Sequence, residues 1–187
     1  MFQGSTSNSA ACMEAIRIIN FLRELWSEHV MWTRSFIIST AANLGDLKPV
    51  TTRLFQNPAD FETVLKQFYG PQLAKQFRDL LTEHLKIAGD LVNAAKAGNT
   101  EAVNEARKKW YLNADEIAAF LANINPFWSK DQWTSMLHEH LKLTEEEAVA
   151  RLAGQYARDI ALYDAIEDQA LMMGDYMAEG IIKQFSR

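Results

Sequence analysis

The amino-acid sequence predicts an all-α protein, an up-and-down four-helix bundle with shorter accessory helices. Three observations predict this fold. The chain of 187 residues holds only eight Gly and four Pro, so residues that interrupt helices are scarce. Apolar residues recur three and four positions apart over long stretches, which is the spacing of one face of a helix. The breaks between these stretches are short, and short connections join antiparallel neighbours in helical bundles.

The first long helix is expected from Met13 to Asn43, where apolar residues keep helical spacing without Gly or Pro. The residues before it carry no charge, and Phe2-Gln3-Gly4 resembles the remnant of a cleaved expression tag. We therefore interpret residues 1–12 as a tail derived from expression and residues 13–187 as a single helical-bundle domain.

Two shorter helices and a second long helix are expected next. Pro49 can open one short helix, and Asn57-Pro58 supplies an N-cap followed by a proline at the first helical position of another. That short helix ends at Gly70. Pro71 then opens the second long helix, which stops at Gly98 in the manner of a helix C-terminus.

The remaining chain is predicted to form two more long helices with a short one between them. The third long helix covers residues 99–125 and ends before Pro126. A capping box at Ser129 opens an accessory helix that reaches about residue 143. A second capping box, Thr144-Glu145-Glu146-Glu147, opens the last long helix, which extends to Phe185.

Composition excludes several classes of partner and cofactor. The net charge of −5 argues against binding to a nucleic-acid backbone, because that affinity comes from an excess of Lys and Arg. No apolar run reaches the roughly 20 residues of a membrane span. The chain has no glycine-rich phosphate loop and no dinucleotide fingerprint, so we expect no nucleotide cofactor. The only cysteine, Cys12, falls in the tail, which favours a reducing cytoplasm.

A Glu-His pair occurs on three of the predicted helices, at residues 28–29, 83–84 and 139–140. Successive residues of a helix point about 100° apart, so the two members of a pair face different surroundings. His29, His84 and His140 each continue a row of apolar residues, whereas Glu83 and Glu139 continue polar rows. The pattern therefore predicts three inward histidines, with Glu83 and Glu139 pointing outward.

These histidines form the candidate metal site. His29, His84, Asn113 and Asp159 each lie roughly 13 to 16 residues into their predicted helices, so they should meet in one layer at mid-height. Imidazole and carboxylate groups are suitable ligands for zinc, iron, manganese or nickel. We therefore predict a divalent metal bound by His29, His84, His140 and Asp159.

The remaining polar neighbours of this layer are expected to be Asn113, Tyr156 and Tyr163. His138 is excluded from the ligand set, because it lies about 200° round the helix from His140. The sequence leaves the role of His138 open.

Two other functions are compatible with the same residues. In the first, the histidines only form a hydrogen-bonded layer that fixes helix register in a non-catalytic structural or interaction protein. In the second, His and Asp serve as bases in a hydrolase or a small-ligand binder, which would need an open cavity reaching the layer. Whether the protein is an enzyme, binds a small molecule or forms a homo-oligomer stays open.

The chain also resembles a known family across most of residues 13–185. The runs at 26–47, 68–85 and 155–171 are similar to those of small bacterial helical proteins, some of which are catalogued as acetylglutamate kinase. The resemblance implies a helical fold and carries no established active site. The kinase activity itself belongs to an α/β fold with a glycine-rich nucleotide site, which this sequence lacks. The three inward histidines also resemble, in outline only, the metal-binding bundles of the DinB-like group, whereas the Glu-x-x-His pattern of ferritin-like di-iron proteins is absent.

Overall fold

A computed structural model describes the backbone of residues 4–185 and the side chains of residues 12–185. The described residues form helices and short connections, without a strand, which confirms the all-α prediction. The helices are α1 (Gly4–Ala42), α2 (Leu47–Leu54), α3 (Asn57–Lys96), α4 (Thr100–Ile124), α5 (Lys130–Leu152) and α6 (Tyr156–Phe185). Among these residues, no helix is both long enough and apolar enough to cross a membrane.

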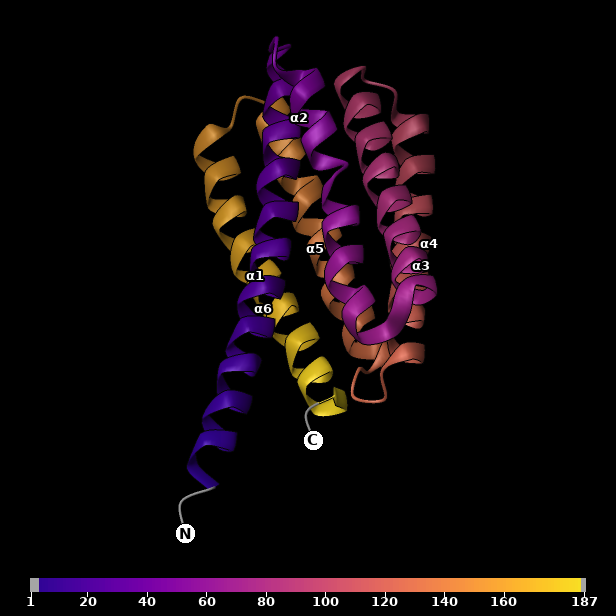
Figure 1. Cartoon of the computed structure of the whole chain (residues 1–187). Coiled ribbons are helices and arrows are strands. Elements are labelled where there is room, and N and C mark those ends of the chain that lie inside the picture. The colour runs from indigo at the N-terminus through magenta and orange to yellow at the C-terminus, as the bar shows by residue number, and fades with distance from the viewer. Residues whose placement is uncertain (1–3, 186–187) are drawn as a thin grey trace.

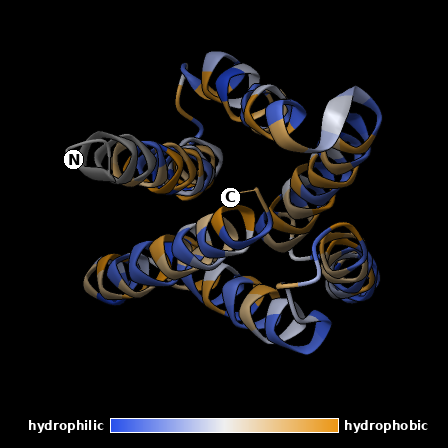
Figure 2. Ribbon diagram, turned by 60° about the horizontal axis from the view of Figure 1, so that its bottom comes forward, coloured by the Kyte–Doolittle hydropathy of each residue, from blue (hydrophilic) through white to orange (hydrophobic). Residues whose placement is uncertain are grey.

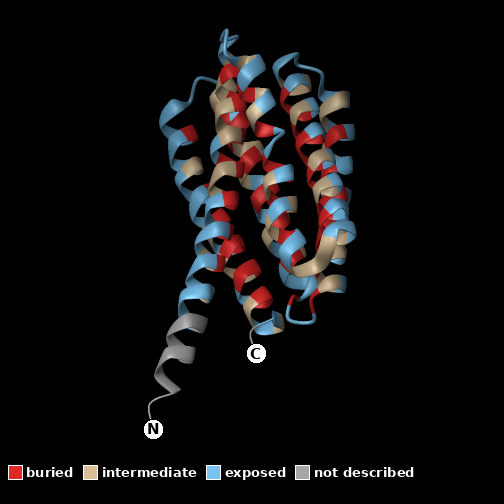
Figure 3. Ribbon diagram, viewed as in Figure 1, coloured by how far each residue is buried: buried red, intermediate tan, exposed pale blue. Residues whose placement is uncertain are grey.

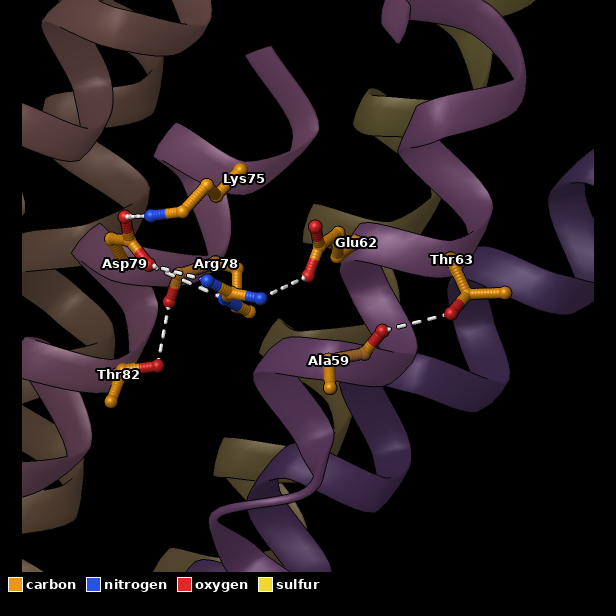
Figure 4. A network of polar contacts seen from close by, with 7 residues as sticks. All are labelled: Ala59, Glu62, Thr63, Lys75, Arg78, Asp79 and Thr82. Atoms are coloured by element: carbon orange, nitrogen blue, oxygen red, sulfur yellow. Dashed lines mark hydrogen bonds and ion pairs between the residues drawn. The ribbon is translucent and has the colours of Figure 1, made fainter. Parts of the chain in front are cut away.

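Helix α3 consists of two limbs that reverse direction at Gly70 (Figure 1). Gly70 has φ 76° and ψ 171°, a conformation that glycine adopts without the steric cost of a Cβ atom. Contacts across the hairpin hold the limbs together: Arg78 Nη1 lies 2.7 Å from Glu62 Oε2 (Figure 4), and the Phe61 and Phe77 rings meet edge to face. The predicted helix boundary at Gly70 and Pro71 is therefore confirmed.

Neighbouring segments run in opposite directions (Figure 1). Helix α1, the second limb of α3, and α5 run one way, whereas the first limb of α3, α4 and α6 run the other way. Five of these segments are long, so the expected number of four long helices is not confirmed.

The extra long segment arises because the chain break before α6 is not where the sequence predicted it. Thr144 lies inside α5, and the break comes at residues 153–155, where Gly154 has φ 72°. The prediction that a helix begins at Thr144 is wrong. The Thr-x-x-Glu pattern resembles a cap, but Thr144 and Glu147 are both buried and face neighbouring helices.

The core lies along the axis of the bundle. Hydrophobic and hydrophilic residues alternate along the helix ribbons (Figure 2), and the buried residues form stripes along the helices (Figure 3). The largest fully buried side chains include Trp26, Phe61, Phe77 and Trp133. This apolar packing surrounds the layer in which the histidines lie.

Helix α6 packs tightly against the loop between α4 and α5 at Gly180. A Cβ atom at this position would lie 1.9 Å from Nε1 of Trp128, which is buried and donates to the Tyr176 carbonyl. Gly180→Ala should therefore lower the free energy of unfolding by about 1–3 kcal/mol in urea denaturation, the usual cost of overpacking. Gly89→Ala is the matched control, because its added Cβ meets the Phe36 ring at an ordinary 3.6 Å. Equal stability of the two variants would contradict the described packing.

Candidate metal centre

The structure brings His29, His84 and His140 together in one buried layer. They lie 13, 12 and 12 residues before the ends of α1, α3 and α5, and these segments run in the same direction (Figure 1). Equal distances from the same end of the bundle place the three side chains at the same height. Each histidine is only 2% exposed, and one ring nitrogen of each lies within 4.8 Å of the others. The predicted inward orientation is confirmed, and Glu83 and Glu139 are exposed as expected.

Asn57 orients the ring of His29. The Asn57 amide nitrogen donates to the Leu25 carbonyl at 2.9 Å, which turns the amide oxygen toward His29. That oxygen lies 3.1 Å from His29 Nδ1. Because an amide oxygen can only accept, Nδ1 must carry the proton of the neutral ring. The lone pair of His29 is consequently on Nε2.

Asn113 orients His84 in the same manner. Its amide nitrogen donates to the Leu80 carbonyl at 3.2 Å, and its oxygen lies 2.9 Å from His84 Nδ1. His84 therefore also carries its proton on Nδ1 and its lone pair on Nε2. The prediction that Asn113 neighbours the histidines is confirmed. Such an acceptor on the distal nitrogen is typical of histidines that bind metals, because it fixes the tautomer and the ring orientation.

The other polar contacts of the layer are incomplete. Trp110 Nε1 donates to His84 Nε2 at 3.2 Å, so this lone pair already accepts a hydrogen bond. The Gln169 amide nitrogen donates to the Met136 carbonyl at 2.7 Å, and the Gln169 side chain also reaches His140. Nε1 of Trp26 has no hydrogen-bond partner. A buried polar group without a partner costs about 1–3 kcal/mol. The Trp26 indole is therefore a donor in this layer without an acceptor.

Burial keeps the three imidazoles neutral. Loss of solvation lowers the pKa of His29 to about 4 and that of His84 to about 3, with the hydrogen bonds that these rings donate to Asn57 and Asn113 acting in the opposite direction. Burial and the two neighbouring imidazoles also hold the pKa of His140 well below its ordinary value. Neutral imidazole is the form that binds metal ions.

Asp159 does not join the histidines. Its fully buried carboxylate lies 2.6 Å from Arg34 Nη1 and 3.2 Å from Arg151 Nη1. The physical reason is the chain break at Gly154, which puts Asp159 in the first turn of α6, near the end of the bundle. Glu147 completes this ion-pair cluster, with its carboxylate 2.5 Å from Arg34 Nη1.

The two tyrosines expected beside the histidines also belong to the ion-pair cluster. The Arg34 guanidinium lies 4.7 Å from the centre of the Tyr163 ring, and the Arg151 guanidinium lies 4.7 Å from that of Tyr156. Tyr156 is 56% exposed.

Burial raises the pKa of Glu147 to about 7, against the opposing effect of Arg34.

Stability should fall as the pH falls below about 6.5. The unfolded chain protonates its histidines near pH 6.5, whereas the lowered pKa values of His29 and His84 delay protonation of the folded protein. Each buried histidine therefore lowers the free energy of unfolding by about 1.4 kcal/mol for every unit by which the pH falls in this range. Glu147 acts in the opposite sense, because its raised pKa lets the folded state bind a proton first.

With His140 included, the folded protein binds roughly two protons fewer than the unfolded chain, three from the histidines less one from Glu147, so the free energy of unfolding should fall by about 3 kcal/mol per unit of decreasing pH. Urea denaturation at about pH 6 and pH 5 measures this slope. A free energy of unfolding that does not change over this range would contradict the buried, neutral state of the histidines.

Three further side chains complete the account of the site. We call His29, His84 and His140 the histidine triad, or simply the triad. His138 lies outside it, with its Nε2 atom 2.8 Å from Asp115 Oδ1. Sequence analysis missed Asn57 and Trp110 as histidine partners. Asn57 matched the pattern of an N-cap, and Trp110 matched an ordinary core position. Neither pattern carries a signal for a contact made with another helix.

The surroundings of the triad do not favour an open substrate site. The three histidines are each 2% exposed, whereas a hydrolase or small-ligand binder was expected to show an open cavity at this layer. No family model, curated protein or solved structure matches the chain. The resemblance to small bacterial helical proteins therefore stays a prediction.

Proposed function

We propose that the protein binds one divalent metal ion through His29, His84 and His140. The observation that carries this proposal is the pair of asparagine contacts. Asn57 and Asn113 are both anchored on backbone carbonyls and both hold a histidine with its proton on Nδ1. Two histidines thus present the same nitrogen for coordination, in an arrangement that matches the outer contacts of metal-binding histidines.

The spacing and chemistry of the triad are compatible with a metal. Three nitrogens bound tetrahedrally to zinc at about 2.0–2.1 Å would lie about 3.4 Å apart. The triad nitrogens lie within 4.8 Å of one another, so the rings need only a small closing movement. Neutral imidazoles suit zinc, iron, manganese or nickel. Because Asp159 is bound by Arg34 and Arg151, the fourth position falls to water or a small ligand.

The alternative is a structural layer without a metal, and one observation favours it. Trp110 Nε1 donates to Nε2 of His84, the atom that a metal would need. In this alternative the contacts of Asn57, Asn113 and Trp110 specify how α1, α3 and α4 pack, and metal binding has no part in the protein's role.

Metal titration of the full chain, purified without a histidine tag and stripped with a chelator, separates the two functions. The proposal predicts one zinc or cobalt ion per chain by elemental analysis. Trp110→Phe should tighten binding about fivefold, because the loss of one hydrogen bond of about 1 kcal/mol frees His84 Nε2. The structural alternative predicts a metal-free chain in both proteins and a less stable variant. Failure to load the wild-type protein would overturn the proposal.

A further inference from the structure

Two histidines of the triad are held by carboxamides that share one kind of anchor. The Asn57 amide nitrogen donates to the backbone carbonyl four residues before His29. The Asn113 amide nitrogen donates to the carbonyl four residues before His84. Residues four apart lie on the same face of a helix, one turn from each other. An amide anchored on that turn brings its oxygen to the ring, and the two oxygens lie 3.1 and 2.9 Å from Nδ1.

Gln169 on α6 has the same anchor beside His140. Its amide nitrogen donates at 2.7 Å to the carbonyl of Met136, which lies four residues before His140. This bond leaves the amide oxygen for the ring, and the Gln169 side chain reaches His140. Burial lowers the pKa of His140, and the contact with Gln169 opposes this effect, as an acceptor for a ring proton does. Because an amide oxygen can only accept, the His140 ring is the donor.

The three histidine–carboxamide pairs recur at a regular interval along the chain. The carboxamide follows its histidine by 28 residues in the first pair and by 29 in the other two. The histidines lie on α1, the second limb of α3 and α5, whereas the carboxamides lie on the first limb of α3, α4 and α6, which run in the opposite direction (Figure 1). The centres of the three imidazole rings lie 5.6, 6.1 and 6.5 Å apart, which is close to an equilateral triangle. The layer is therefore built from three similar pairs around one centre.

We propose that Gln169 is the positioning residue of the third ligand: it accepts the Nδ1 hydrogen of His140 and so directs the Nε2 lone pair of this ring toward the metal. The inference rests on the proposed function, because it assigns a role at the same metal site. Helix α6 then serves the site through Gln169, and not through Asp159 as the sequence predicted. All three histidines present Nε2, each fixed by a neutral carboxamide on Nδ1.

Gln169→Met tests this role, because methionine keeps the length of the side chain and removes the amide. The zinc affinity of the untagged full chain, measured by competition with a chelator, should fall by about 10- to 100-fold, the usual effect of losing the partner of a metal-binding histidine. Gln184→Met is the matched control. Gln184 lies on the same helix and also donates to a backbone carbonyl, that of Ile124, but its oxygen accepts from Tyr69. This control should change the zinc affinity by no more than about twofold.

Nitrogen-15 NMR of the imidazole rings in the zinc-free full chain gives a second readout, which requires neither metal nor a folded variant. Wild-type His140 should carry its proton on Nδ1. In Gln169→Met, the same ring should populate both tautomers, because the acceptor that selects one of them is gone. A loss of packing alone would lower stability without changing the tautomer. Wild-type His140 protonated on Nε2 would overturn the inference.

The zinc measurements separate this inference from the proposed function. A wild-type chain that binds no zinc would overturn the proposed function, and the positioning role with it. A wild-type chain that binds zinc no more tightly than folded Gln169→Met would overturn only the role of Gln169. Equal losses in Gln169→Met and Gln184→Met would also overturn that role, because the effect would then come from the packing of α6.

Discussion

Arg34→Met should lower the free energy of unfolding by about 3–5 kcal/mol at pH 7. The Glu147 and Asp159 side chains are 2% and 0% exposed, and Arg34 contacts both of them. Without the guanidinium, the fully buried Asp159 keeps only Arg151, at 3.2 Å, whereas Glu147 takes up a proton because its pKa is already raised to about 7. Urea denaturation measures the loss.

Two further variants show whether the effect comes from buried charge. Arg17→Met removes an exposed pair with Glu14, whose side chains are 70% and 62% exposed, and should change stability by no more than about 0.5 kcal/mol. Asp159→Asn added to Arg34→Met should recover part of the loss, because it removes the buried carboxylate that has lost its nearer partner. A loss below about 1 kcal/mol in Arg34→Met alone would contradict the role assigned to this cluster.

His84→Ala should weaken binding of zinc by more than about a hundredfold, since changes to residues that merely support a metal ligand already cost 10–100-fold. The variant removes one of three proposed ligands and also leaves Asn113 without its histidine partner. Competition with a chromogenic chelator measures the zinc affinity.

The fourth histidine of the chain offers a matched control. His138 lies on the same helix as His140 but contacts Asp115 outside the triad. His138→Gln should change the zinc affinity by no more than about twofold. This is far smaller than the tenfold change that corresponds to about 1.4 kcal/mol of binding free energy. Equal losses in His84→Ala and His138→Gln would indicate adsorption of zinc to accessible histidines instead of a site in the core.

The orientation of the histidines could be predicted from the sequence because it depends on local periodicity. A residue that continues an apolar row of a helix faces the core in almost any packing of that helix. His29, His84 and His140 each continue such a row, and Asn113 does so on the helix opposite. The all-α fold followed from the same periodicity and from the scarcity of Gly and Pro.

The errors came from one misplaced helix boundary. Thr144 and Glu147 match a capping box, but the residues before them also form helices well, so α5 continues to Leu152. This shift moved Asp159, Tyr156 and Tyr163 from an expected mid-helix layer to the first turns of α6. Gly154, which follows α5 with φ 72°, is the local signal for the true boundary, and the contact of Glu147 with Arg34 buries the residues that matched a cap.

The contacts that complete the site could not be predicted for a similar reason. Asn57 reaches His29 from the first turn of another helix, and Trp110 reaches His84 from α4. Helical periodicity shows that such residues face inward, but it does not show which side chain they meet there.

X-ray absorption at the zinc edge of the zinc-loaded, untagged protein tests the metal centre most directly. The three-histidine site predicts one zinc per chain, with three imidazole nitrogens at about 2.0–2.1 Å and one further light ligand. Zinc that is lost on desalting, or a ligand shell made only of oxygen atoms, would contradict the proposed centre and leave the triad as a structural layer.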